Sequence, residues 1–178
     1  MSLYFNNAFS KRPHQDVIHT MLPFITDEYE NPLTESDGAE RARTALDVAR
    51  KQIATLIHAK SSEIFFVSSG TEANNWALKG LAQAWSGKKD HIVISAIEHF
   101  SVYQTAQFLS RHGSKVTIVP VNGEGIVNPD DVANAILPST FAVSVQSASD
   151  EVGVIQNIQA LSNLKHRFPE VAFHTDAI

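Results

Sequence analysis

Residues 65–80 read FFVSSGTEANNWALKG, and this stretch decides the fold. The apolar run at residues 64–67 predicts a β-strand, and the helical pattern that opens at Glu72 predicts a helix directly after it. The turn between them, residues 68–71, gathers free backbone N–H groups at a helix N-terminus, where they can bind a phosphate. The serine and threonine hydroxyls of the turn can add further hydrogen bonds. The stretch therefore predicts a phosphate-bearing ligand at the carboxyl end of a parallel strand.

The chain has the length and composition of one globular domain. It holds 178 residues, of which 43% are hydrophobic, and this is enough for a sizeable core. The net charge of −5 argues against nucleic acid as a partner, because binding a phosphate backbone requires a basic surface. No apolar run approaches a membrane span and no signal segment opens the chain, so we expect a cytoplasmic protein that binds no membrane. Without cysteine, the chain can form no disulfide, thiolate metal site or cysteine nucleophile.

From residue 63 onward, short apolar segments alternate with amphipathic ones. The apolar segments are rich in β-branched residues and predict strands over residues 64–67, 91–95, 115–119, 141–145 and 171–175. The segments between them predict helices over residues 72–84, 101–111, 129–136 and 158–167, and a further helix precedes them over residues 39–57. Residues 1–38 are less regular, with prolines 13, 23 and 32 marking turns. The pattern favours an α/β fold with a mostly parallel sheet flanked by helices.

Polar residues follow several of the predicted strands, among them His99 and Asp176. Because the carboxyl ends of parallel strands share one edge, these side chains can converge with Thr71 on one crevice. Each also has a simpler interpretation: Thr71 as a helix cap, His99 as a surface histidine and Asp176 as a cap of a following helix. A buried Asp176 is costly unless it is paired, which favours a partner for it. No carboxylate or thiolate accompanies His14 and His19, so we expect no metal site.

Four motifs occur in a fixed order: SSGTEANNWALKG from residue 68, IEHFSV from residue 97, DEVGVIQ from residue 150 and HTDA from residue 174. Together they resemble the N-terminal half of the cysteine desulfurase branch of the class V aminotransferases, which are pyridoxal 5'-phosphate enzymes. The resemblance implies the type I pyridoxal-phosphate fold, present here in incomplete form. It implies an N-terminal arm over residues 1–15 and the N-terminal part of the large cofactor-binding α/β domain over residues 16–178.

The resemblance assigns a role to each matched position. It implies that Gly70 and Thr71 hold the cofactor phosphate, and that His99 stacks on the pyridine ring and acts as the catalytic proton carrier. Asp176 would pair with the pyridinium nitrogen and keep it protonated, so that the ring can accept electrons from a substrate carbanion. Ser149 stands where the family has an asparagine that contacts the ring oxygen, so this contact is expected to be shortened or lost.

Two catalytic parts of the family are expected outside this chain. The Schiff-base lysine and the persulfide cysteine both lie further along the family sequence than residue 178, so the chain alone is expected to be inactive. The leading hypothesis is the N-terminal part of a cysteine desulfurase, which cleaves the C–S bond of a small amino-acid substrate. Such a protein would form a homo-oligomer and pass sulfur to an acceptor protein.

Two other functions were weighed against this hypothesis. A catalytically inactive, desulfurase-like interaction protein is the main alternative, and altered residues at the expected substrate wall, such as those at 33–36, favour it. A nucleotide-binding doubly wound domain is disfavoured, because the first turn lacks the G-x-G-x-x-G spacing. Whether the chain is part of a desulfurase or an inactive interaction protein, we expect its sheet to have an exposed strand edge and an exposed apolar patch. Both features favour self-association.

Overall fold

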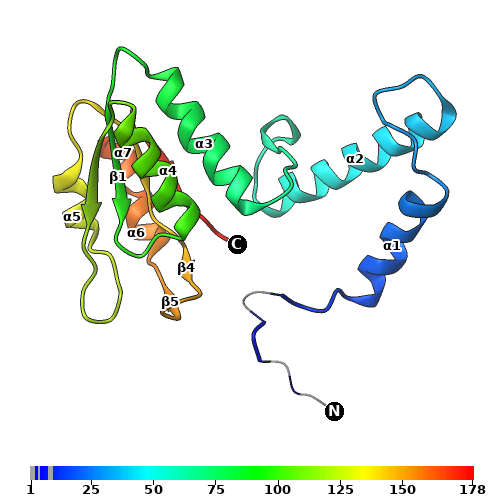
Figure 1. Cartoon of the computed structure of the whole chain (residues 1–178), viewed down its shortest axis with the longest axis horizontal. Helices are drawn as coiled ribbons and strands as arrows, with labels where there is room; N and C mark the ends of the chain where they lie inside the picture. The colour runs from blue at the N-terminus through cyan, green and yellow to red at the C-terminus, as the bar shows by residue number, and fades with distance from the viewer. Residues whose placement is uncertain (1–2, 4, 8–9) are drawn as a thin grey trace. The chain divides into compact units, whose positions relative to one another are not determined.

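A computed structural model describes residues 3, 5–7 and 10–178 of the chain (Figure 1). The chain forms two compact units, Met1–Phe66 and Val67–Ile178. The predicted arm, residues 1–15, lies partly outside the described residues. In the part that the structure describes, no helix combines the length and the apolar character needed to cross a membrane.

The first unit contains α1 (Gln15–Thr26), α2 (Asp37–Leu56) and the short 3₁₀ helix η1 (Ser61–Glu63). The helix predicted over residues 39–57 is confirmed as α2, which begins where Ser36 caps the backbone N–H of Ala39. The turn predicted at Pro23 is wrong, because Pro23 lies inside α1. A proline near the end of a helix removes one backbone hydrogen bond, and the helix ends within a turn of it.

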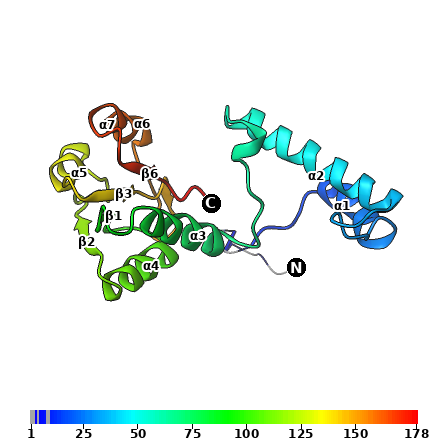
Figure 2. The same cartoon turned by 90° about the horizontal axis from the view of Figure 1, so that it is seen from above.

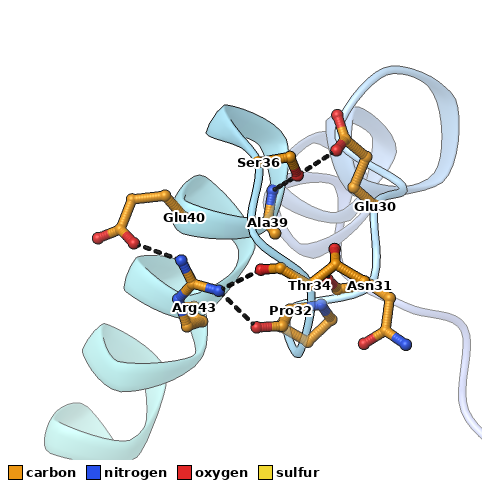
Figure 3. A network of polar contacts seen from close by, with 8 residues as sticks. All are labelled: Glu30, Asn31, Pro32, Thr34, Ser36, Ala39, Glu40 and Arg43. Carbon is orange, nitrogen blue, oxygen red and sulfur yellow. Dashed lines mark hydrogen bonds and ion pairs between the residues drawn. The ribbon is translucent and has the colours of Figure 1, made fainter.

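The loop between α1 and α2 is held by Arg43 (Figure 3). Its guanidinium donates to the carbonyl oxygens of Pro32 and Thr34 at 2.8 and 2.7 Å, and to Glu40 Oε2 at 2.6 Å. The rigid planar guanidinium holds these three acceptors in fixed directions, and the flexible point charge of a lysine does not supply that geometry. One side chain of α2 thereby fixes the path of the preceding loop.

Gly38, in the first turn of α2, lies against the side chain of Glu30. The Glu30 carboxylate accepts a hydrogen bond from Ser36 Oγ beside this turn, and a Cβ on Gly38 would collide with it. A carboxylate at a helix N-terminus is favoured by the helix dipole. The missing side chain therefore makes room for a favourable charge.

The second unit is built on a parallel sheet of four strands in the order β2-β1-β3-β6. The strands are β1 (His91–Ser95), β2 (Lys115–Val119), β3 (Thr140–Ser144) and β6 (Ala172–His174). Two short strands, β4 (Ala148–Ser149) and β5 (Val154–Ile155), form a separate antiparallel pair. The predicted α/β fold with a mostly parallel sheet is confirmed.

Helices cover both faces of this sheet (Figure 2). They are α3 (Gly70–Ala84), α4 (Phe100–Arg111), α5 (Pro129–Ala135), α6 (Ile158–Ser162) and α7 (Leu164–Arg167). Ile92 and Ile94 of β1 pack with α3 and α4, whereas Val93 between them packs with the cluster formed by α5, α6 and α7. Alternate residues of a strand point to opposite faces, so one strand serves both cores. The helix predicted over residues 158–167 is divided in two at Asn163.

The strand predicted over residues 64–67 is wrong. Ile64 has an extended backbone, but the sheet ends at β2 and β6, and among the described strands none pairs with this segment. Phe65 and Phe66 are 66% and 49% exposed. A strand needs backbone partners on a neighbouring strand, and an apolar composition does not supply them.

Candidate functional site

At the N-terminus of α3, some of the backbone N–H groups are capped and others have no partner within the helix. Ser69 Oγ accepts from the backbone N–H of Glu72 at 3.2 Å, and the Ser69 carbonyl accepts from that of Ala73 at 3.0 Å. These bonds satisfy two of the first-turn donors and leave the N–H groups of Gly70 and Thr71, which have no partner within the helix. Such groups, with the positive end of the helix dipole, form an anion site.

Glu72 stabilises the turn that precedes α3 through two hydrogen bonds to Ser68. Its Oε2 accepts from the hydroxyl of Ser68 at 2.6 Å and from the backbone N–H of Ser68 at 2.7 Å. Both bonds lower the pKa of Glu72 below its ordinary value, and the bond from the Ser68 hydroxyl has the larger effect. The predicted turn at residues 68–71 is thus built from local hydrogen bonds, although no strand leads into it.

Gly70 lacks a Cβ at a point where a neighbouring side chain comes close to the turn. A Cβ at this position would collide with Cδ1 of Ile178, so the backbone of the turn is approached closely from outside the helix. The missing side chain leaves the first-turn backbone accessible, as a phosphate cradle requires. Thr71, the next residue, lines a groove between α3 and α4, and His99 lines the same groove.

A chain of hydrogen bonds joins His99 to Asp176. Asn74 donates its two amide hydrogens to Ser101 Oγ and to Asp176 Oδ2, both at 2.8 Å. Ser101 Oγ lies 2.7 Å from Nδ1 of His99. Asn74, Ser101 and Asp176 are 4%, 5% and 6% exposed, so the chain runs through the interior and reaches the surface at His99. The structure therefore brings two of the predicted site residues into one network.

The network fixes which ring nitrogen of His99 carries the proton. The backbone N–H of Ser101 donates to Nδ1 at 3.2 Å, so Nδ1 is an acceptor. The Ser101 hydroxyl accepts from Asn74 and can therefore give its own hydrogen to the same Nδ1. The neutral imidazole of His99 is left with its hydrogen on Nε2.

Asp176 keeps room for one more donor. Its Oδ2 accepts from Asn74, and its Oδ1 accepts from the backbone N–H of Ile178 at 3.2 Å. A carboxylate offers about four lone-pair sites, so these two bonds leave part of its capacity unused. Among the described residues, none forms an ion pair with this buried carboxylate. A cationic N–H donor is the group that such a site accommodates best.

A second acid lies behind Asp176 and was not predicted as a site residue. Glu98 accepts three hydrogen bonds, from Ser95 Oγ at 2.7 Å, from Ser144 Oγ at 2.9 Å and from the backbone N–H of Gln146 at 2.8 Å. Burial raises the pKa of Glu98 despite these bonds, and the nearby Asp176 carboxylate adds to the rise.

Ser149 lies apart from this network, in the β4–β5 pair. Its side chain is 6% exposed, and its hydroxyl accepts from the backbone N–H of Val152 at 3.4 Å. The residue is thus engaged within its own hairpin, and its predicted contact with a cofactor ring stays a prediction.

Comparison with known proteins places the chain in a family. The model of the family "Aminotransferase class-V" matches residues 3–178. The chain belongs to this family. Its members depend on pyridoxal phosphate, and the relatives that resemble this chain are of the cysteine desulfurase type.

The class V relatives are longer than this chain. The chain is 39% identical to "Cysteine desulfurase IscS" of Clostridium botulinum over 176 residues, which are 99% of this chain and 44% of the relative. It is 41% identical to "Cysteine desulfurase, mitochondrial" of Arthroderma benhamiae over 165 residues, 90% of this chain and 32% of that one. The chain therefore spans less than half the length of these curated relatives.

Solved structures of class V proteins share the fold. A "NIFS-LIKE PROTEIN" superimposes with a TM-score of 0.96 at 34% identity, over 100% of this chain and 49% of that chain. The structure "SspA in complex with cysteine" superimposes with a TM-score of 0.94 at 35% identity, over 99% of this chain and 50% of that one.

Proposed function

We propose that this chain is the cofactor-cradling part of a pyridoxal-phosphate-dependent cysteine desulfurase. The observation that carries the proposal is the buried Asp176, which is oriented by Asn74, linked to His99 and left with unused acceptor capacity. The likeness to proteins named as cysteine desulfurases, and to one described with cysteine, supports cysteine as the substrate.

The residues present fit the cofactor at each of its ends. Gly70 and Thr71 offer the helix N-terminus for the phosphate, where glycine at residue 70 keeps the space beside the N–H groups open. Asp176 offers a buried carboxylate for a pyridinium N–H. His99 would face the ring, and Ser149 would reach the ring oxygen less well than the longer asparagine of the family. The bound cofactor supplies an electron sink for the carbon next to the amino group of the substrate.

The proposed work of the chain's own residues follows from their bonds. Asp176 holds a proton on the pyridine nitrogen, because a buried carboxylate stabilises an adjacent cation. Asn74 holds that carboxylate in one orientation, since only its amide nitrogen can face an anion. His99 presents Nε2–H outward as its exchangeable proton.

The proposal assigns the remaining catalytic groups to the longer protein that would contain this chain. These are the lysine that anchors the cofactor and the cysteine that carries sulfur. The proposed protein is a cytoplasmic homo-oligomer that acts on a small amino acid and delivers sulfur to an acceptor protein.

The test is carried out on the full-length protein. With pyridoxal 5'-phosphate bound, we expect visible absorbance and release of sulfide from L-cysteine in the presence of a reducing thiol. D176N should lose most of both signals, whereas D130N, at an exposed position on α5, should retain them. A full-length wild-type protein without cofactor absorbance or sulfide release would refute the enzyme. Stable complex formation in that case would support the inactive interaction protein.

A further inference from the structure

The carboxyl ends of two strands, β1 and β3, meet at Glu98. The residue follows β1, and its three hydrogen bonds come from Ser95 at the end of β1, Ser144 at the end of β3 and Gln146 just beyond β3. Ser95, Ser144 and Gln146 are at most 6% exposed. Ser144 also contacts β6, because its Oγ lies 2.9 Å from Nδ1 of His174. One carboxylate thus joins the strand ends, near enough to Asp176 for the two charges to interact.

The direction of each hydrogen bond in this cluster can be assigned. An ionised carboxylate only accepts, so the single hydroxyl hydrogen of Ser144 goes to Glu98 Oε2. Ser144 Oγ then has only lone pairs for His174, and Nδ1 of His174 must be the donor. His174 therefore carries its hydrogen on Nδ1, the reverse of the arrangement at His99.

We propose that Glu98 is a positioning residue: through the hydroxyl of Ser144 it sets the Nδ1–H tautomer of His174 and holds β6 so that Asp176 is correctly placed. Burial lowers the pKa of His174, so the neutral ring, in which the choice of tautomer matters, is favoured. The link to Asp176 rests on the proposed function, whereas the tautomer does not.

Substitution E98Q keeps the shape of the side chain but should reverse the direction of the hydrogen bonds that run from Glu98 through Ser144 to His174, which we call the relay. The backbone N–H of Gln146 needs an acceptor, which keeps the amide oxygen of the new side chain at the Oε1 position. The new NH₂ group then faces Ser144 and donates to it. Ser144 must turn its hydrogen toward Nδ1 of His174, and the ring must move its own hydrogen to Nε2.

The test is a long-range ¹H–¹⁵N correlation spectrum of the ¹⁵N-histidine-labelled, cofactor-free chain, with His174 assigned from an H174Q sample. We expect a protonated Nδ1 and a bare Nε2 in the wild type, and the opposite in E98Q. S95A removes a different bond to Glu98 and should keep the wild-type pattern. A wild-type spectrum with the hydrogen on Nε2, or an E98Q spectrum equal to the wild type, would overturn the proposal.

A second pair of variants keeps the test decisive if E98Q does not fold. S144T retains the hydroxyl and should retain the Nδ1–H tautomer, whereas S144A removes the relay and should give a mixture of the two tautomers. An S144A spectrum identical to the wild type would contradict the relay.

The link to Asp176 is measured separately, as cofactor affinity of the full-length protein. E98Q should weaken pyridoxal 5'-phosphate binding about tenfold and S95A should not, because only E98Q alters the relay to β6. A switched tautomer with unchanged affinity would overturn the link to Asp176. Failure of the proposed function looks different, since the wild-type protein would then bind no cofactor while the tautomer pattern remained.

Discussion

The amide nitrogen of Asn74 lies 2.8 Å from Oδ2 of Asp176, although the two residues are 102 positions apart in the chain. One side chain of α3 therefore donates a hydrogen bond to a buried carboxylate that follows β6. The bond ties α3 to the segment that follows β6 in the second unit.

The first prediction concerns the loss of that bond. N74L should lower the free energy of unfolding by about 2–3 kcal/mol, because it removes the donor of a buried anion as well as the bond to Ser101. Urea denaturation of the cofactor-free chain measures the change. N75A is the matched control, since Asn75 bonds only to the carbonyl of Thr71 in its own helix and should cost less than about 1 kcal/mol. Equal losses in the two variants would mean that Asn74 does not stabilise Asp176.

The second prediction concerns the phosphate cradle. G70A introduces a Cβ that collides only with the far end of the Ile178 side chain, which is 92% exposed and free to swing away. Stability should therefore change by less than about 1 kcal/mol. Affinity of the full-length protein for pyridoxal 5'-phosphate should nevertheless fall about tenfold, because the methyl group fills the space beside the first-turn N–H groups. Unchanged affinity in equilibrium titration would place the phosphate elsewhere.

The third prediction concerns pH. Burial lowers the pKa of His91 below its ordinary value of 6.5, and its ring nitrogens are bonded to the hydroxyls of Thr140 and Thr117 at 2.7 and 2.9 Å. Between the folded and unfolded pKa values the unfolded chain binds more protons, so this group's contribution is complete above pH 6.5 and is lost as the pH falls.

Comparison of variants isolates the effect of His91. H91Q should show a shallower loss of unfolding free energy on acidification than the wild type, by at most about 1.4 kcal/mol per pH unit. H19Q, at an exposed position on α1, should keep the wild-type slope. Denaturant titrations between about pH 5 and pH 7 measure the slopes, and parallel curves for wild type and H91Q would contradict the assignment.

The first unit offers a test of its own at Arg43. R43K keeps the charge but cannot reach both carbonyls and Glu40, so the loop between α1 and α2 should become less stable by about 1–2 kcal/mol. Faster amide hydrogen exchange across residues 31–36 is the expected signal. K51Q, on the same helix at an exposed position, should leave that exchange unchanged.

Self-association is expected through α1. None of its residues is buried, and Val17, Met21 and Ile25 are 48%, 54% and 66% exposed. An apolar helix face of this kind favours association with a second copy of the chain. Light scattering should show a mass above that of the monomer, and the double variant M21E/I25E should lower it, whereas Q15E should not. A monomeric wild type would contradict the expectation.

Local sequence patterns predicted much of the second unit. Strands β1 and β2 have the predicted bounds, because a short run of β-branched residues between turns is a strong signal. The predicted strand over residues 64–67 failed because pairing depends on a distant neighbour. Asn74 and Glu98 stand within recognisable motifs, but their roles depend on partners 102 and 46 positions away, which no local pattern contains.

The bond between α3 and Asp176 also sets an order of events during protein synthesis. Asn74 leaves the ribosome 102 residues before the carboxylate that completes its hydrogen bonding. Because β6 comes last in sequence among the described strands of the sheet, the nascent chain can build α3, α4, β1, β2 and β3 before Asp176 is synthesised. Under the proposed function, the cofactor would therefore be captured late in folding, after β6 has joined β3.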